Sequence, residues 1–191
     1  MKLVFATNNQ HKLQEVREIL GNSIQVLSLK DIHFDTEIPE TQETIEGNAC
    51  QKARFIHDLT GLDCFADDTG LFIDALDGRP GVYSARYAGE NCSFHDNVVK
   101  VLSELGDDVN RKAEFRCAVC LILDGQELLF SGKVEGKIIE KERGTDGFGY
   151  DPVFQPEGSD LTFAELPADA KNSISHRGRA VREMMMYVDG D

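Results

Sequence analysis

The stretch "AEFRCAVCLILDGQELLFSGKVEGKIIE", residues 113–140, decides the fold class of this 191-residue chain. Two apolar runs flank Asp124-Gly125, and an Asp-Gly pair in such a position is a strong signal for a two-residue hairpin. The stretch therefore predicts two antiparallel strands. Cys117 and Cys120 lie three residues apart on the first strand, so they should face opposite sides of it. We interpret them as ordinary buried thiols rather than as half of a metal site or a disulfide.

Upstream of the hairpin, strand-like and helix-like segments alternate. The predicted strands are 2–7, 24–29 and 62–70, the last of which ends in a turn. The predicted helices are 11–21, 44–61 and 93–106, and a further helix covers 170–188 near the end of the chain. Alternation followed by an antiparallel hairpin indicates an α/β fold with a mixed sheet rather than a purely parallel one.

The charge balance excludes some classes of partner. The chain holds 34 acidic and 20 basic residues, for a formal net charge of −14, which argues against nonspecific binding to nucleic acid or to an anionic membrane. No apolar run is long enough to cross a bilayer, and the apolar start of the chain is too short for a signal peptide. We therefore expect a cytoplasmic protein with residues 1–191 in one domain, which has room for two lobes.

The motif "ATNNQHK", residues 6–12, places polar side chains where a predicted strand ends and a helix begins. Free N–H groups at a helix start attract anions, and Lys12 adds a charge one turn into the helix. On its own, this motif is better explained by Asn8 or Asn9 as a simple cap of the helix. Neither standard glycine-rich nucleotide loop is present.

The motif "CFADDTG" puts Asp67 and Asp68 at the end of a predicted strand. Neighbouring side chains on a strand point in opposite directions, so the two should not share a proton. One of them is a candidate for binding a metal or accepting a proton from water, and the alternative is an acidic turn. Glu37, Glu40 and Glu43 are further candidate oxygen ligands in a polar loop, which is otherwise simply solvated.

The motif "GFGYDP" offers Phe148 and Tyr150 for stacking on a planar base, with glycines that permit close backbone approach. A turn with two core aromatic residues is the alternative.

The window "AKNSISHRGRAVR", residues 170–182, carries five basic residues and no acid in an otherwise acidic chain. Lys171, His176 and Arg177 come near a predicted helix start, where the helix dipole favours acids instead. That mismatch favours a functional role over a basic face that balances nearby acids.

Taken together, "ATNNQHK", "PETQET", "ADDTGL", "PGVYSARY", "GFGYDPVF" and "KNSISHRG" closely resemble the inosine triphosphate pyrophosphatase family. The resemblance implies an elongated mixed β-sheet with flanking helices, forming two lobes with a central active-site cleft, usually in a homodimer. It implies Mg²⁺-dependent hydrolysis of non-canonical purine nucleoside triphosphates (ITP, dITP and XTP) to the monophosphate and pyrophosphate, which cleanses the nucleotide pool.

The resemblance also implies roles for individual residues. Asp68 would be the proton acceptor, and Glu40 and Asp68 would serve the metal. The residues implied to bind substrate are Thr7, Asn8, Asn9, Gln10, His11, Lys12, Thr69, Phe148, Gly149, Tyr150, Asp151, Lys171, His176 and Arg177.

Two further points concern individual positions. The family often has Glu directly before "NA" in the second helix, but here Gly47 precedes Asn48 and Glu46 is shifted by one. This favours Glu40 over Glu46 as a metal ligand. Arg177 is the expected reader of the base, because its donors can pair with a 6-keto oxygen but not with the 6-amino group of adenine.

Two other functions fit part of the pattern. An aspartyl-phosphate phosphatase also has a strand ending in acids, but it spaces its aspartates as DxD and would leave the glycine-rich and basic motifs unexplained. A noncatalytic nucleotide-binding regulator would bind the same substrate without releasing pyrophosphate.

Overall fold

The computed structural model describes residues 1–190. Its sheet has the strand order β2-β1-β3-β5-β6-β7, with β4 pairing with β3 off this path. The strands are β1 (Lys2–Phe5), β2 (Gln25–Leu27), β3 (Cys64–Ile73), β4 (Pro80–Gly81), β5 (Lys112–Leu123), β6 (Gln126–Ile138) and β7 (Phe154–Pro156). The helices are α1 (Gln10–Leu20), α2 (Ile45–Thr60), α3 (Phe94–Leu105), α4 (Ala168–Ile174) and α5 (His176–Asp189), with two short 3-10 turns at Asp74–Leu76 and Ser84–Arg86.

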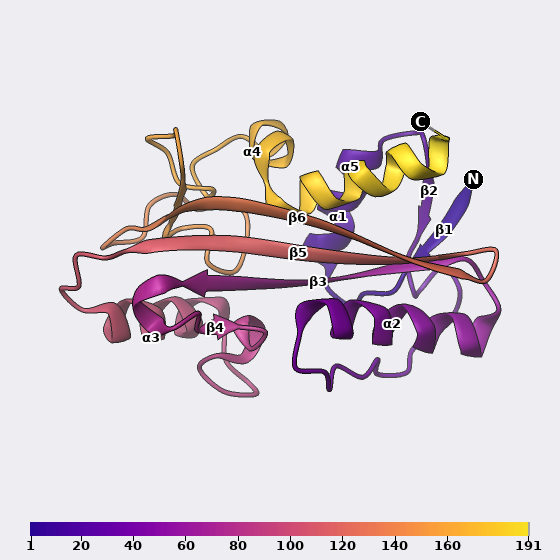
Figure 1. The fold of residues 1–191 in the computed structure, drawn as a ribbon, viewed down its shortest axis with the longest axis horizontal. Coiled ribbons are helices and arrows are strands. Elements are labelled where there is room, and N and C mark those ends of the chain that lie inside the picture. Colours follow the sequence, from indigo (N-terminus) through magenta and orange to yellow (C-terminus); the bar gives the residue numbers. More distant parts are fainter. Residues whose placement is uncertain (191) are drawn as a thin grey trace. The chain divides into compact units, whose positions relative to one another are not determined.

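The sheet is mixed, as the sequence predicts. Strand β1 pairs in parallel with β2 and β3, whereas β4 runs antiparallel to β3 and β7 antiparallel to β6. Strands β5 and β6 form the long hairpin labelled in Figure 1. Asp124 and Gly125 join them with φ angles of 50° and 76°, and positive φ at both positions is what a two-residue hairpin turn requires.

The chain divides into two compact units. Unit 1 comprises residues 1–68, 117–132 and 176–191, and unit 2 comprises residues 69–116 and 133–175. Each unit has its own apolar core. In unit 1, Val16 of α1 and Met184 of α5 belong to the same buried cluster as Phe65 of β3. In unit 2, α3 supplies Val98 and Val101 to a cluster that also contains Phe154 and Phe163.

The end of β3 differs from the prediction. The sequence suggests that a strand ends at Asp67 and Asp68, but β3 continues to Ile73. Its first half pairs with β1 as far as Phe65, and its second half pairs with β4 at Leu71 and Phe72. The two aspartates therefore lie in the middle of a strand, just beyond the last residue that pairs with β1.

The predicted helix 170–188 is also wrong in one respect. The segment forms two helices that are separated by Ser175, whose φ and ψ of −66° and 156° are extended rather than helical. Lys171 lies on α4, whereas His176 and Arg177 begin α5. The break therefore places Lys171 in unit 2 and the other two residues in unit 1.

No helix within residues 1–190 is long and apolar enough to span a membrane.

Candidate active site

Unit 1 brings the turn before α1 close to β3. Thr7 Oγ1 accepts a hydrogen bond from the backbone N–H of Asn9 at 3.1 Å, and Asn9 Oδ1 accepts from the N–H of Lys12 at 3.1 Å. Asn9 is thus the N-cap of α1, which has no acid in its first turn. Asn8, Gln10 and His11 are exposed beside this cap. The result is a helix start whose first turn carries a lysine and no acid of its own, which suits an anion.

Asp67 is the centre of a buried ion-pair network. Lys12 Nζ donates to Asp67 Oδ1 at 3.0 Å, and Arg177 Nε donates to Oδ2 at 2.9 Å. The Asp67 side chain is 1% exposed. Burial alone would raise the pKa of Asp67, but the charges of Lys12 and Arg177 hold it well below its usual range. Asp67 is therefore ionised at neutral pH and fixes both cations.

Arg177 is buried and forms ion pairs with two carboxylates, which the sequence does not suggest. Besides Asp67, its NH1 group donates to Glu15 Oε2 at 2.5 Å, and its side chain is 2% exposed. Burial alone would lower the pKa of Arg177, but the two carboxylates raise it. Direct reading of a base by Arg177 stays a prediction, and it would have to be reconciled with these two ion pairs. His176, the first residue of α5, is also buried.

Asp68 faces a different set of partners, as expected for neighbouring strand residues. Its Oδ2 accepts a hydrogen bond from Asn48 Nδ2 at 3.0 Å, and its Oδ1 lies 3.9 Å from Lys52 Nζ. Lys52 also donates to Glu40 Oε1. Burial raises the pKa of Asp68 despite the nearby lysines. Burial alone would raise the pKa of Glu40, but the charge and hydrogen bond of Lys52 together with the charge of Lys12 lower it.

Sequence reasoning missed Asn48, Lys52 and Glu15. The first two lie on the buried face of α2, in a stripe consisting of Ile45, Asn48, Ala49, Lys52, Ala53 and Ile56. An amide and a lysine at helical spacing within an apolar stripe must meet polar partners, because burying them unpaired is costly. That pattern is visible in the sequence and could have identified both residues. Glu15 has no such signal, since it is partly exposed on α1.

Glu46 lies outside this cluster, and the packing at Gly47 leaves no room for a side chain at the position before Asn48. Glu46 is exposed, whereas a Cβ atom at residue 47 would lie 2.8 Å from Gln42 Cβ and 3.0 Å from Thr44 Oγ1. Thr44 caps α2 by accepting from the Gly47 N–H. The preceding loop therefore packs directly on Gly47, and this chain offers Glu40 rather than a residue of the first α2 turn to Asp68.

Unit 2 holds the predicted base-binding motif. Lys171 Nζ donates to Asp151 Oδ2 at 2.6 Å, with both side chains buried, and lies 5.1 Å from the centre of the Phe148 ring. Asp151 Oδ2 also accepts from the backbone N–H of Phe148 at 2.9 Å. Gly147 has a φ of 75°, and a Cβ atom there would lie 2.1 Å from the same carboxylate oxygen. Glycine is thus required for this loop to close on Asp151.

The two aromatic residues of the motif differ in their surroundings. Tyr150 is 4% exposed within the unit 2 core, and its hydroxyl donates to the carbonyl oxygen of Ser84 at 2.7 Å. Phe148 is only half-buried. Stacking on a base therefore suits Phe148, while Tyr150 supports the loop from beneath. Gly149 and Thr69 are also half-buried in this unit.

The predicted site residues therefore form two sets. Unit 1 holds Thr7, Asn8, Asn9, Gln10, His11, Lys12, Glu40, Asp68, His176 and Arg177. Unit 2 holds Thr69, Phe148, Gly149, Tyr150, Asp151 and Lys171. The first set is rich in ionised groups and the second combines an aromatic ring with a buried ion pair. The first suits phosphate and a cation, and the second suits a base.

The chain is similar to known proteins over nearly its whole length. The model of the Ham1 family matches residues 3–187. The chain belongs to the Ham1 family. A protein of Flavobacterium johnsoniae named dITP/XTP pyrophosphatase is 52% identical over 185 residues, covering 97% of this chain and 96% of the relative. A protein of the same name from Porphyromonas gingivalis is 52% identical over 188 residues, covering 98% and 97%.

Solved structures agree with the fold. The structure of a HAM1 protein from Coxiella burnetii matches with a TM-score of 0.90 and 38% sequence identity, covering 100% of both chains. The Ham1 protein of Staphylococcus aureus matches with a TM-score of 0.89 and 37% identity, covering 100% of this chain and 99% of that one. The predicted mixed α/β fold and the family resemblance are both confirmed.

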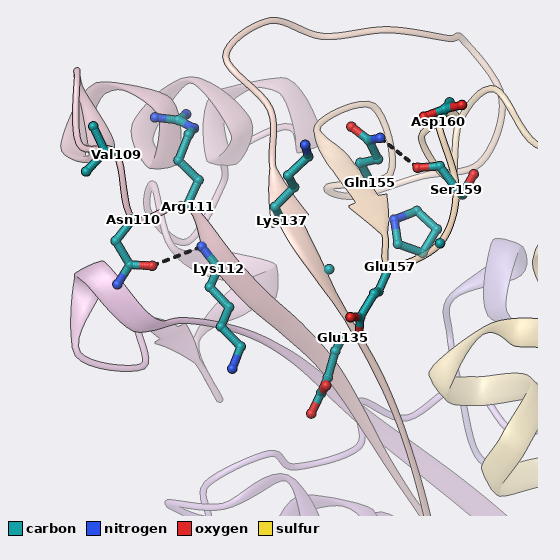
Figure 2. A pocket seen from close by; sticks show the side chains of 13 residues that line it. Val109, Asn110, Arg111, Lys112, Glu135, Lys137, Gln155, Glu157, Ser159 and Asp160 are labelled. Atoms are coloured by element: carbon teal, nitrogen blue, oxygen red, sulfur yellow. Dashed lines mark hydrogen bonds between the residues drawn. The ribbon is translucent and has the colours of Figure 1, made fainter.

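An open groove of about 970 Å³ in unit 2 contains none of the predicted Ham1-family site residues. Arg111, Lys112 and Lys137 line it together with Glu135, Glu157 and Asp160, as Figure 2 shows. Arg111 is occupied by backbone carbonyl oxygens, including that of Ile138 at 2.7 Å. The alternating charges of the other side chains give no focused site for an anion, so we assign no function to this groove.

Proposed function

We propose that this Ham1-family protein hydrolyses dITP, ITP and XTP to the corresponding monophosphate and pyrophosphate. The names of its relatives support the substrate class. The observation that carries the proposal is the cluster of Asp68, Glu40, Lys52 and Asn48 in unit 1, which holds a buried carboxylate with a raised pKa beside cationic groups. Perturbed carboxylates of this kind are typical of acid–base sites.

The same cluster fits a magnesium ion. Mg²⁺ prefers carboxylate oxygens and is usually held by one or two carboxylates together with substrate phosphates. Glu40 and Asp68 already share one cation, the Lys52 ammonium group, so a positive charge is favoured between them. Glu40 and Asp68 would hold the ion, which would neutralise phosphate charge in the reaction. Mg²⁺ dependence is thus part of the proposal.

Asp68 is the proposed general base. Its pKa is raised by burial, which brings it closer to the value that suits proton transfer near neutral pH. Asn48 fixes one carboxylate oxygen through its amide, so the orientation of Asp68 is set before substrate binds. Lys12 and the start of α1 would bind phosphate oxygens, with Asp67 holding the Lys12 ammonium group in place.

In unit 2, Phe148 would stack on the purine, while the Asp151–Lys171 pair keeps its loop rigid. Preorganisation of this kind lowers the cost of binding. A homodimer that works in the cytoplasm stays a prediction from the family resemblance.

A panel of nucleoside triphosphates tests the proposed function. Purified protein with Mg²⁺ should release pyrophosphate from ITP, dITP and XTP much faster than from ATP, GTP and the pyrimidine nucleotides. Tight binding of ITP without pyrophosphate release would instead identify a noncatalytic nucleotide-binding regulator.

Replacing Glu40 by glutamine should raise the Mg²⁺ concentration needed for half-maximal activity by about tenfold or more, because the metal loses a charged ligand. Turnover at saturating Mg²⁺ should fall less. Activity is measured over a Mg²⁺ titration, and thermal melts with and without Mg²⁺ report binding independently. Glu37→Gln, an exposed change in the same loop, is the control. An unchanged Mg²⁺ requirement in Glu40→Gln would remove Glu40 from the metal site.

Replacing Lys171 by methionine should raise KM for ITP by about tenfold to a hundredfold, because Asp151 loses its charged partner and the loop that carries Phe148 is less well held. Steady-state kinetics separates KM from kcat. Lys133→Met is the matched control, since that lysine is 60% exposed in the same unit. A normal KM in Lys171→Met would contradict the role of this ion pair in base binding.

A further inference from the structure

A cluster of potential metal ligands lies elsewhere in unit 1. Cys50 on α2, Cys120 on β5 and Glu127 on β6 each offer one ligand atom, and the three atoms all lie within 4.8 Å of one another. This is the one such group of three or more among the residues that the structure describes. None of its members belongs to the predicted active site.

The strand geometry explains how this cluster arises. As predicted, Cys117 and Cys120 face opposite sides of β5. The Sγ atom of Cys117 lies 3.9 Å from Asp67 Oδ2, whereas Cys120 lies beside Cys50 of α2. The sequence-based interpretation of Cys120 as an ordinary buried thiol rested on the spacing to Cys117 alone. Cys50 is 70 residues away in the sequence, so the pattern "CAVC" gave no hint of the second thiol.

We propose that Cys50, Cys120 and Glu127 form a binding site for a thiophilic divalent cation, with Zn²⁺ as the best match. Two thiolates and one carboxylate are zinc ligands, and three protein ligands leave a fourth position for water. Zn–S bonds of about 2.3 Å at tetrahedral angles place the two sulfur atoms about 3.8 Å apart. Ligand atoms within 4.8 Å thus need to move by only about 1 Å.

Electrostatics favours the same assignment. Arg54, one turn after Cys50 on α2, donates from Nε and NH2 to the two carboxylate oxygens of Glu127, both at 2.5 Å. Two thiolates, Glu127 and Arg54 leave two negative charges, which a divalent cation neutralises. Binding of the metal would deprotonate both thiols.

The proposed metal site is open to solvent on one side, and Arg54 holds one of its ligands, Glu127, in position. Cys120 is buried, Cys50 is partly exposed and Glu127 is exposed, so an ion can enter from the solvent side past Glu127. Arg54 can retain one oxygen of Glu127 while the other turns to the metal, as an outer partner of a metal ligand commonly does. An ion bound here would join α2 to the β5–β6 hairpin, and α2 also carries Asn48 and Lys52 of the active site.

Titration with Co²⁺ tests the proposal, since thiolate ligands give Co²⁺ an intense charge-transfer absorption and carboxylates do not. Reduced, chelator-treated protein should bind one Co²⁺ per chain with this absorption, and Zn²⁺ should displace it. Cys50→Ser and Cys120→Ser should each lower the charge-transfer intensity by about half and weaken affinity by at least about a hundredfold. Glu127→Gln should weaken affinity by about tenfold or more, and Cys92→Ser in unit 2 should change nothing.

Thermal melts with Zn²⁺ and the activity of Cys50→Ser distinguish loss of the metal site from loss of folding. Zn²⁺ should raise the melting temperature of the unsubstituted protein but not that of Cys50→Ser, because a ligand that binds only the folded state stabilises it. Cys50→Ser should retain Mg²⁺-supported hydrolysis of ITP, which shows that it is folded even if Cys120→Ser is not. Absence of thiolate charge transfer in the unsubstituted protein, or an unchanged spectrum in Cys50→Ser, would overturn the proposal.

Discussion

Replacing Asp68 by asparagine should lower kcat for ITP by about a thousandfold, the range expected when a general base is lost. The amide has nearly the same shape and can still accept the hydrogen bond from Asn48. It cannot accept a proton from water, and it is a weaker ligand for Mg²⁺. Turnover of ITP is measured at saturating substrate, with Asp58→Asn, an exposed change on α2, as the control.

The stability of Asp68→Asn should be unchanged or increased. Since burial raises the pKa of Asp68, the folded chain disfavours its ionised form, and a neutral amide removes that cost at neutral pH. A thermal melt measures this directly. An inactive protein that melts at the normal temperature or above would support a catalytic role. A folded Asp68→Asn protein with normal turnover would refute it.

Replacing Asp67 by asparagine should greatly lower the stability of the protein, in contrast to the change at Asp68. Removing one member of a buried ion pair leaves its partner charged and unpaired, at a cost of about 3–5 kcal/mol. Here two cations, Lys12 and Arg177, lose their shared carboxylate. Urea unfolding should therefore show a free energy of unfolding lower by about that amount, and Asp58→Asn should change it by less than about 0.5 kcal/mol.

The ion pairs of Asp67 with Lys12 and Arg177 also predict how the free energy of unfolding depends on pH. The pKa of Asp67 is held below its usual range in the folded protein, so its contribution to stability is present above the unfolded value of about 4. That contribution is lost as the pH falls through the folded value. Between about pH 5 and pH 2 the unsubstituted protein should lose more stability than Asp67→Asn does. Parallel acid-unfolding curves would contradict the assignment of Asp67 as a buried, ionised anchor.

The predictions for Asp67→Asn and Asp68→Asn distinguish two neighbouring aspartates that look alike in the sequence. Alternation along a strand correctly indicates that Asp67 and Asp68 face different surroundings. It gives no information on which cations lie on each side, because Lys12, Lys52 and Arg177 come from three different helices. The structure gives Asp67 the larger expected effect on stability. Asp68 stays the proposed residue for catalysis.

Other features could be predicted because their causes are local. The hairpin at Asp124-Gly125 follows from the backbone preferences of two residues, and the N-cap at Asn9 follows from its own hydrogen bond. By contrast, the extended Ser175 interrupts a segment whose apolar spacing predicts one continuous helix. The weak helix formers Asn172, Ser173, Ser175 and Gly178 around the break were outweighed by that spacing.

The chemical sites show the same contrast. Motifs identify Asp68, Phe148 and Lys171 because each stands in a short, specific stretch. Lys52 was missed because its partners are Glu40 and Asp68, which lie 12 and 16 residues away in the sequence. Cys50 and Cys120 are a more extreme case, since only the packing of α2 against the sheet brings the two thiols together.

Product analysis of ITP hydrolysis tests the central claim most directly. Protein is incubated with ITP and Mg²⁺, and samples from the earliest times are separated by ion-exchange chromatography, with Asp68→Asn as the blank. We predict that inosine monophosphate and pyrophosphate appear together in equal amounts from the first time point, without inosine diphosphate. Inosine diphosphate and orthophosphate as the initial products would contradict the account.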